Sequence, residues 1–166
     1  MRATFFAAQE ATKEGDGTLG KHWAPWWKAR AAEGHEFASH TWDHAYWQAD
    51  LPPAQPGGEA RFRIRPSSGA QSGKTLSWTG AQYCANLQLA ADRLVSITQR
   101  KVLPLFRAAG GKTSPKLLAA AEACGFKHVG WAPAGFLGDE LPSGQYPNDA
   151  LLKKALQDIR PGDILM

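Results

Sequence analysis

The stretch Gly34–His44, GHEFASHTWDH, says most about the fold of this sequence. Gly34 stands where the left-handed C-terminal cap of a preceding helix belongs, and Glu36–Ser39 suits a short strand. His40 and His44 then fall on the loop that leaves the carboxyl end of that strand. Because functional side chains of parallel α/β folds gather at this edge of the sheet, the stretch predicts both a fold class and a site.

Outward from this stretch, predicted strands and helices alternate along the chain. Thr79 and Gln82 form a capping box, and apolar residues at helical spacing continue that helix to about Arg100. This order predicts an α/β fold with a parallel sheet and helices outside it, either a (β/α) barrel or an open doubly wound sheet. The expected strands are 2–8, 36–39, 102–106, 126–131 and 164–166, and the expected helices begin at about Trp23, Gly80, Pro115 and Leu151, the last capped by Asn148.

Residues 51–78 differ in composition from the rest of the chain. They are rich in Pro, Gly and Ser, and the alternating run Arg61–Arg65 is the main interruption. This predicts an insertion with one small hairpin inside a single domain that spans residues 1–166. The arginines of the run could meet an acidic polymer, but a solvated hairpin face is the favoured interpretation.

The composition indicates a globular protein of the soluble class, with 166 residues, 43% hydrophobic and 20% charged. No run approaches the roughly 18 apolar residues of a membrane-spanning helix, so we expect no transmembrane segment. No signal peptide is visible in residues 1–9. The formal net charge of +4 is small, so we expect no nucleic-acid partner. Compartment and oligomeric state stay open.

Two further residue types are informative, since the chain contains two cysteines and seven tryptophans. Cys84 and Cys124 have no CxxC spacing, which indicates neither a zinc ribbon nor a disulfide scaffold, and we expect buried thiols. Most of the tryptophans lie between residues 23 and 47. Those of the first helix favour core packing over a sugar platform, whereas Trp42 and Trp47, beside the histidines, are expected to line a cleft.

His40 and His44 are four residues apart and can share one divalent ion. With five histidines in the chain, this spacing arises by accident in about one sequence in eight. A surface pair packed against Trp42 and Trp47 therefore stays the alternative. A hydrolytic metal centre also needs a third protein ligand and an open position for water. The candidates for that ligand are Asp43, Asp50 and Asp139, and their spacing singles out none of them.

Short motifs occur in one order along nearly the whole chain: Ala3–Phe6, Gly34–His44, Arg107–Gly110, Gly130–Trp131 and Pro161–Leu165. Together they resemble the polysaccharide deacetylases, carbohydrate esterase family four with its NodB-homology domain. The resemblance implies a distorted (β/α) barrel. It also implies a metal-dependent hydrolase that removes acetyl groups from a glycan such as chitin or peptidoglycan, acting on carbon–nitrogen bonds other than peptide bonds.

The resemblance also implies roles for individual residues. His40 and His44 match two metal-binding histidines, with one divalent ion, zinc or another, as the expected cofactor. Arg107 matches the arginine that orients the catalytic carboxylate, and Asp139 matches the aspartate that tunes a catalytic histidine. Trp131 matches an aromatic residue of the acetyl pocket.

This sequence departs from the family pattern at several points. The family carries an aspartate pair before the strand that matches Ala3–Phe6 and a histidine after Pro161–Leu165. The resemblance thus predicts a domain incomplete at both termini, with the catalytic base, the third metal ligand and the general acid outside it. Ala109 stands where the family's arginine motif has proline. The alternative function is a glycan-binding or pseudoenzyme module that keeps the scaffold.

Overall fold

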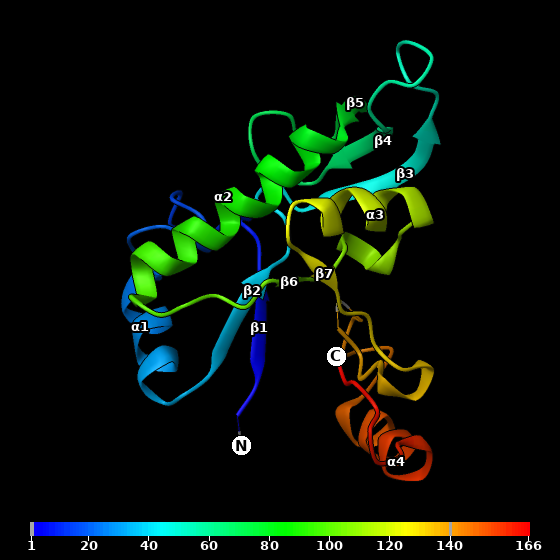
Figure 1. Cartoon of the computed structure of the whole chain (residues 1–166). Coiled ribbons are helices and arrows are strands. Elements are labelled where there is room, and N and C mark those ends of the chain that lie inside the picture. Colours follow the sequence, from blue (N-terminus) through cyan, green and yellow to red (C-terminus); the bar gives the residue numbers. More distant parts are fainter. Residues whose placement is uncertain (1, 140) are drawn as a thin grey trace. The chain divides into compact units, whose positions relative to one another are not determined.

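The structure, a computed structural model, describes residues 2–139 and 141–166. The chain divides into two compact units, and the boundary lies between Val129 and Gly130. The first unit contains both sheets and the helices α1 to α3, and the second contains α4 (Figure 1). The single domain expected over residues 1–166 stays a prediction.

A four-stranded parallel sheet with the order β1-β2-β6-β7 carries the histidine loop. In its β1–β2 register Phe5 lies beside Phe37. Because the strands run parallel, the residues after their carboxyl ends share one edge of the sheet. The predicted α/β fold is confirmed, while the sheet within the described residues is open, not closed into a barrel. The strands are β1 (Thr4–Ala7), β2 (Glu36–Ser39), β6 (Leu105–Phe106) and β7 (Lys127–His128).

A second sheet has three antiparallel strands in the order β3-β4-β5. The sequence predicts one small hairpin within residues 51–78. The structure corrects this prediction, because the sheet also contains a strand that begins before residue 51. In the middle strand Phe62 and Ile64 are fully buried, whereas Arg63 and Arg65 are exposed. The solvated face favoured for the arginine run is confirmed for Arg63 and Arg65, while Arg61 is partly buried. The strands are β3 (Ala45–Leu51), β4 (Arg61–Pro66) and β5 (Leu76–Thr79).

The helices of the first unit begin where the sequence predicts. At the capping box the Gln82 backbone N–H donates to Thr79 Oγ1, and the Thr79 N–H donates to Gln82 Oε1 at 2.8 Å. Ser114 Oγ accepts a hydrogen bond from the Leu117 N–H at 3.1 Å and so caps α3. The longest helix, α2, packs against α1, α3, β2 and β5. The helices are α1 (Ala24–Ala32), α2 (Gly80–Thr98) and α3 (Pro115–Ala123).

Two apolar cores lie along α2, which contributes Leu87 to one and Leu94 to the other. Trp27 belongs to the second core, is 8% exposed, and meets the rings of Phe5 and Phe37 edge-on. The packing role expected for the tryptophans of the first helix is therefore confirmed for Trp27. These cores fix α2 against the parallel sheet. The loop that carries His40 and His44 is in turn hydrogen-bonded to α2.

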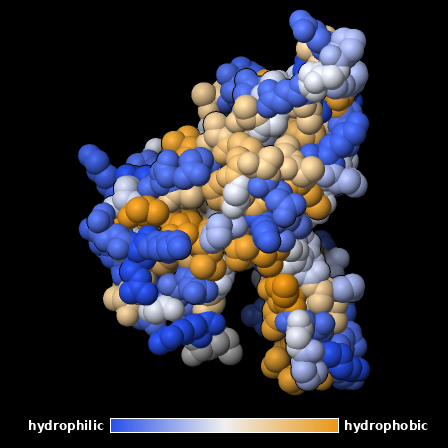
Figure 2. Space-filling view, viewed as in Figure 1, coloured by the Kyte–Doolittle hydropathy of each residue, from blue (hydrophilic) through white to orange (hydrophobic). Residues whose placement is uncertain are grey.

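A disulfide joins Cys84 of α2 to Cys124 at the end of α3. The prediction of two buried thiols was therefore wrong, and Cys124 is in fact exposed. Helix packing brings the two residues together, which their spacing in the sequence could not indicate. A hollow of about 640 Å³ lies beside the disulfide, and half of its lining residues are alanines. Figure 2 shows this face of α2 and α3 as moderately apolar.

The second unit differs from the sequence-based expectation at its helix and at its end. The helix α4 (Asn148–Asp158) has Pro147 at its N-cap, so the predicted Asn148 cap was wrong. The strand expected at 164–166 is absent from the described residues, and the Ile164 carbonyl accepts a hydrogen bond from the Ala132 N–H instead. No helix of the described chain is long and apolar enough to span a bilayer.

Candidate metal centre

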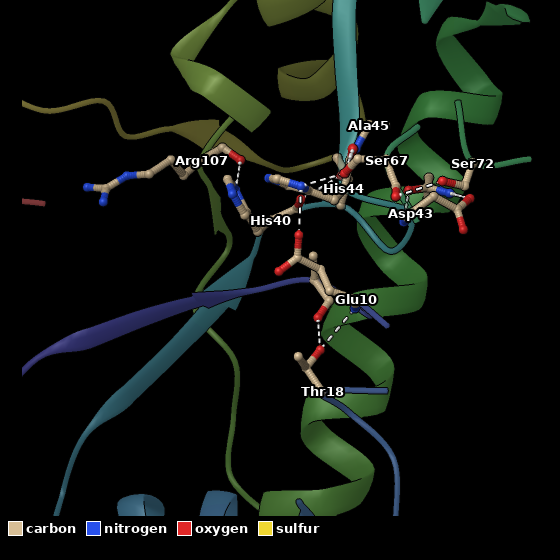
Figure 3. Close-up of polar contacts among 12 residues, drawn as sticks. Glu10, Thr18, His40, Asp43, His44, Ala45, Ser67, Ser72 and Arg107 are labelled. Carbon is tan, nitrogen blue, oxygen red and sulfur yellow. Dashed lines mark hydrogen bonds and ion pairs between the residues drawn. The ribbon is translucent and has the colours of Figure 1, made fainter. Parts of the chain in front are cut away.

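The loop between β2 and β3 carries both predicted metal ligands, and Figure 3 shows their rings beside each other. Their ring centroids lie 4.7 Å apart. Thr41 and His44 have positive φ angles of 65° and 47°, which are uncommon for residues other than glycine and cost on the order of 1–3 kcal/mol each. Both residues are buried, so the surrounding elements must hold this turn.

Asn86 of α2 holds the loop from one side. Its carbonyl accepts a hydrogen bond from the Trp42 N–H at 3.0 Å, and its Oδ1 accepts one from the Asp43 N–H at 3.1 Å. Its amide Nδ2 donates to Asp43 Oδ2 at 2.7 Å. The Gln9 N–H, after β1, donates to the Trp42 carbonyl at 2.9 Å. The loop is therefore fixed by a helix and by the adjacent strand.

Two of the three aspartates considered as a third ligand have structural partners. Asp43 is bound to Asn86, as above. Asp50 Oδ1 accepts hydrogen bonds from Trp47 Nε1 at 3.1 Å and from Ser114 Oγ at 2.6 Å. These carboxylates therefore hold the loop and the second sheet in place.

His40 has the hydrogen bonding and charge state of a metal ligand. Its Nδ1 lies 2.7 Å from the Arg107 carbonyl oxygen. Because a carbonyl can only accept, Nδ1 must carry the hydrogen, which leaves the lone pair on Nε2. Burial lowers the pKa of His40 to about 4, so the ring is neutral at neutral pH and able to ligate.

His44 is held by a residue that the sequence analysis did not identify. Its Nδ1 lies 2.8 Å from Glu10 Oε1 and 2.7 Å from Ser67 Oγ. The hydrogen bond from His44 is the largest cause that lowers the pKa of the Glu10 carboxyl group. Glu10 follows β1 and belongs to no motif. It could still have been identified as a candidate, because it follows the strand that pairs with β2.

Arg107 follows β6 and is 9% exposed. Its Nε donates to the Val129 carbonyl at 3.1 Å, and its guanidinium carbon lies 4.5 Å from the centroid of the Phe6 ring. The nearby His128 has a pKa lowered by burial first and by Arg107 second. The arginine thus joins the histidine loop to the parallel sheet through its backbone carbonyl and its side chain.

The distance between the two rings is close to that of two imidazoles on one divalent ion. Two imidazoles on one tetrahedral ion, at about 2.1 Å each, have centroids roughly 5 Å apart, close to the 4.7 Å seen between His40 and His44. Within residues 2–139 and 141–166, no group of three His, Cys, Asp or Glu side chains is arranged to hold a metal. Within the described residues, His40 and His44 are therefore the two candidate ligands of such a site, and their binding of a metal stays a prediction.

The other predicted site residues lie in different surroundings. Trp42 is half-buried and packs against the core that contains Trp27. Trp131 and Asp139 belong to the second unit, where Trp131 contacts the Phe136 ring and Asp139 is exposed. The structure brings His40, His44 and Arg107 together, and the roles of all six residues stay predictions.

A polar hollow of about 480 Å³ is lined by residues that follow or contact the histidine loop. Two of its lining residues contact His44 directly: the Tyr46 ring at a centroid distance of 5.0 Å and Ser67 through its hydroxyl group. Arg65 and Lys112 add positive charge to the lining. Hydrogen-bonding groups and an aromatic ring around a shallow hollow are suited to a hydroxyl-rich ligand.

Comparison with known proteins assigns this scaffold to a family. The family model described as polysaccharide deacetylase matches residues 1–129. The chain therefore belongs to the polysaccharide deacetylase family, as the sequence motifs predict. A search of curated proteins found no match.

Solved structures of carbohydrate esterase family four have the same fold. An esterase from Streptomyces lividans in complex with acetate is 16% identical, with a TM-score of 0.61 over 99% of this chain and 64% of its own. PdaA from Bacillus subtilis is 18% identical, with a TM-score of 0.62 over 99% and 54%. The pseudoenzyme BA3943 from Bacillus anthracis is 15% identical, with a TM-score of 0.59 over 98% and 44%. This chain thus spans about half the length of these structures.

Proposed function

We propose that this chain forms the metal-binding part of a hydrolase that removes acetyl groups from a glycan, acting on carbon–nitrogen bonds other than peptide bonds. The family supports the class of enzyme. The hydrogen bonding of the two histidines supports the metal: each Nδ1 faces an acceptor, Arg107 O for His40 and Glu10 for His44. Both Nε2 lone pairs are thereby left for one divalent ion, zinc in our proposal.

When bound, a divalent ion lowers the pKa of a coordinated water and polarises the acetyl carbonyl. In this proposal His40 and His44 supply two ligands, and Arg107 orients a catalytic carboxylate. Asp139 tunes a catalytic histidine. Trp131 and Trp42 contact the acetylated sugar, since aromatic faces pack on apolar sugar surfaces.

Release of acetate from an N-acetylated chitooligosaccharide tests the proposal. The assay uses a protein that contains this whole chain, with zinc added, beside its His44→Ala variant. We expect release to fall at least about 100-fold in the variant, because a ligand of the metal is lost. His22→Ala is the matched control, since His22 is exposed and lies outside the site, and it should keep the wild-type rate.

A glycan-binding module without catalysis is the second candidate. The observation that favours it is the two-ligand set, because no third ligand is arranged beside the histidines within the described chain. It predicts saturable binding of the same oligosaccharide, with acetate release at the level of His44→Ala. That outcome would contradict the hydrolase proposal and support the binding module.

A further inference from the structure

Glu10 is a charged residue beside the candidate metal centre, and no sequence motif includes it. Its Oε1 lies 2.8 Å from His44 Nδ1, and Figure 3 shows the carboxylate directed at the imidazole. The His44 side chain is 7% exposed and that of Glu10 is 47% exposed. The contact is therefore half-shielded from water, where an ion-assisted hydrogen bond is stronger than on an open surface.

The chain holds Glu10 in place through its backbone. The Glu10 N–H donates to Thr18 Oγ1 at 3.0 Å, and the Thr18 N–H donates to the Glu10 carbonyl at 2.9 Å. The adjacent Gln9 accepts from the Leu19 N–H at 2.7 Å and donates to the Asp16 carbonyl at 2.7 Å. These bonds tie the segment after β1 to the following loop. The backbone that carries the Glu10 side chain is therefore held in place.

The chemistry of the contact fixes the hydrogen on His44. An ionised carboxylate accepts hydrogen bonds and cannot donate them, so the 2.8 Å contact requires a hydrogen on Nδ1. Ser67 Oγ, a second neighbour of Nδ1, donates its one hydrogen to the His44 carbonyl at 3.3 Å, so toward Nδ1 it acts as an acceptor. The second ring nitrogen, Nε2, then keeps its lone pair, as metal-bound histidines require.

We propose that Glu10 is a positioning residue of the metal centre, whose carboxylate holds His44 with the hydrogen on Nδ1 and keeps Nε2 for a divalent ion. This inference rests on the proposed function, because the site is the same. Because its Oε1 contacts Nδ1 and not the Nε2 that is left for the ion, Glu10 acts through His44. Its negative charge also raises the basicity of the His44 ring toward the metal.

Zinc titration against a chromogenic chelator tests the effect on affinity. We expect Glu10→Ala to weaken zinc binding by about 10- to 100-fold, the range found for such partners of ligating histidines. Glu10→Gln keeps an acceptor without the charge and should fall between Glu10→Ala and wild type. Ser67→Ala removes a neutral group and should have a smaller effect than Glu10→Ala. Glu36→Ala, an exposed glutamate at the amino end of β2, should bind zinc like wild type.

The ring hydrogen of His44 can be observed directly by long-range ¹H–¹⁵N NMR of the metal-free protein at pH 8. We expect the Nδ1–H form of His44 in wild type and a lower population of that form in Glu10→Ala. Equal populations in both proteins, or zinc affinity in Glu10→Ala within twofold of wild type, would overturn the inference. If the wild type binds no zinc, the proposed function fails, and the NMR comparison still decides whether Glu10 sets the form of His44.

Discussion

At the scale of single residues, Asn86 determines how the histidine loop is held. Its side chain makes two hydrogen bonds to Asp43, one to the backbone and one to the carboxylate. We expect Asn86→Ala to lower the free energy of unfolding by about 1–3 kcal/mol, because partly buried polar groups of Asp43 lose their partners. Urea unfolding followed by circular dichroism measures this.

Gln88→Ala is the matched control for Asn86→Ala. Gln88 is on the same helix, is exposed, and bonds to the exposed Asp92. It should change the free energy of unfolding by less than about 0.5 kcal/mol. Equal losses in the two variants would contradict the role given to Asn86.

From residue spacing alone, the candidate site could be predicted only where its residues lie close together in the chain, whereas Arg107 was expected from the family resemblance. His40 and His44 were found from their spacing after a strand, and the structure places their rings side by side. Glu10 lies thirty positions before His40 and carries no motif, so its contact depends on the pairing of β1 with β2. Asp43 was considered as a ligand because of its position, but its partner, Asn86, is on a distant helix.

At the scale of elements, the start of α2 is fixed by a local signal that the sequence shows in full. Thr79 Oγ1 accepts from the Gln82 N–H at 3.2 Å, and we expect Thr79→Ala to cost about 1 kcal/mol in the free energy of unfolding. Thr75→Ala removes the same atoms from an exposed position outside any helix or strand. A loss in Thr75→Ala as large as in Thr79→Ala, again by urea unfolding, would disprove the capping role.

The strand β3 was not predicted from the sequence, and it shows why some elements cannot be recognised there. Its pairing with β4 shifts register between Trp47 and Ala49. A bulge of this kind breaks the period-two alternation by which a half-buried strand is recognised in a sequence. The capping box of α2 depends on neighbours in sequence, whereas β3 depends on its pairing with β4.

At the scale of the whole molecule, the disulfide should contribute strongly to stability. Cys84 and Cys124 are 40 residues apart in sequence, and closing a loop of this length constrains the unfolded chain by about 3–4 kcal/mol in the chain-entropy description. We therefore expect reductant to lower the free energy of unfolding by about this amount. Urea unfolding with and without dithiothreitol measures it.

The double variant Cys84→Ser with Cys124→Ser provides the control. Its unfolding should resemble that of the reduced wild type and should not respond to reductant. A wild type whose unfolding is insensitive to reductant, together with two thiols in a thiol titration, would show that the disulfide does not form.

At the carboxyl edge of the parallel sheet, His40 and His44 are proposed to bind one divalent ion together. Zinc content by elemental analysis after gel filtration tests this most directly, in wild type, His40→Ala and His22→Ala. We predict zinc in wild type and in His22→Ala, below one ion per chain because the described residues offer only two candidate ligands, and a clear loss in His40→Ala. Equal zinc in wild type and His40→Ala would contradict the claim.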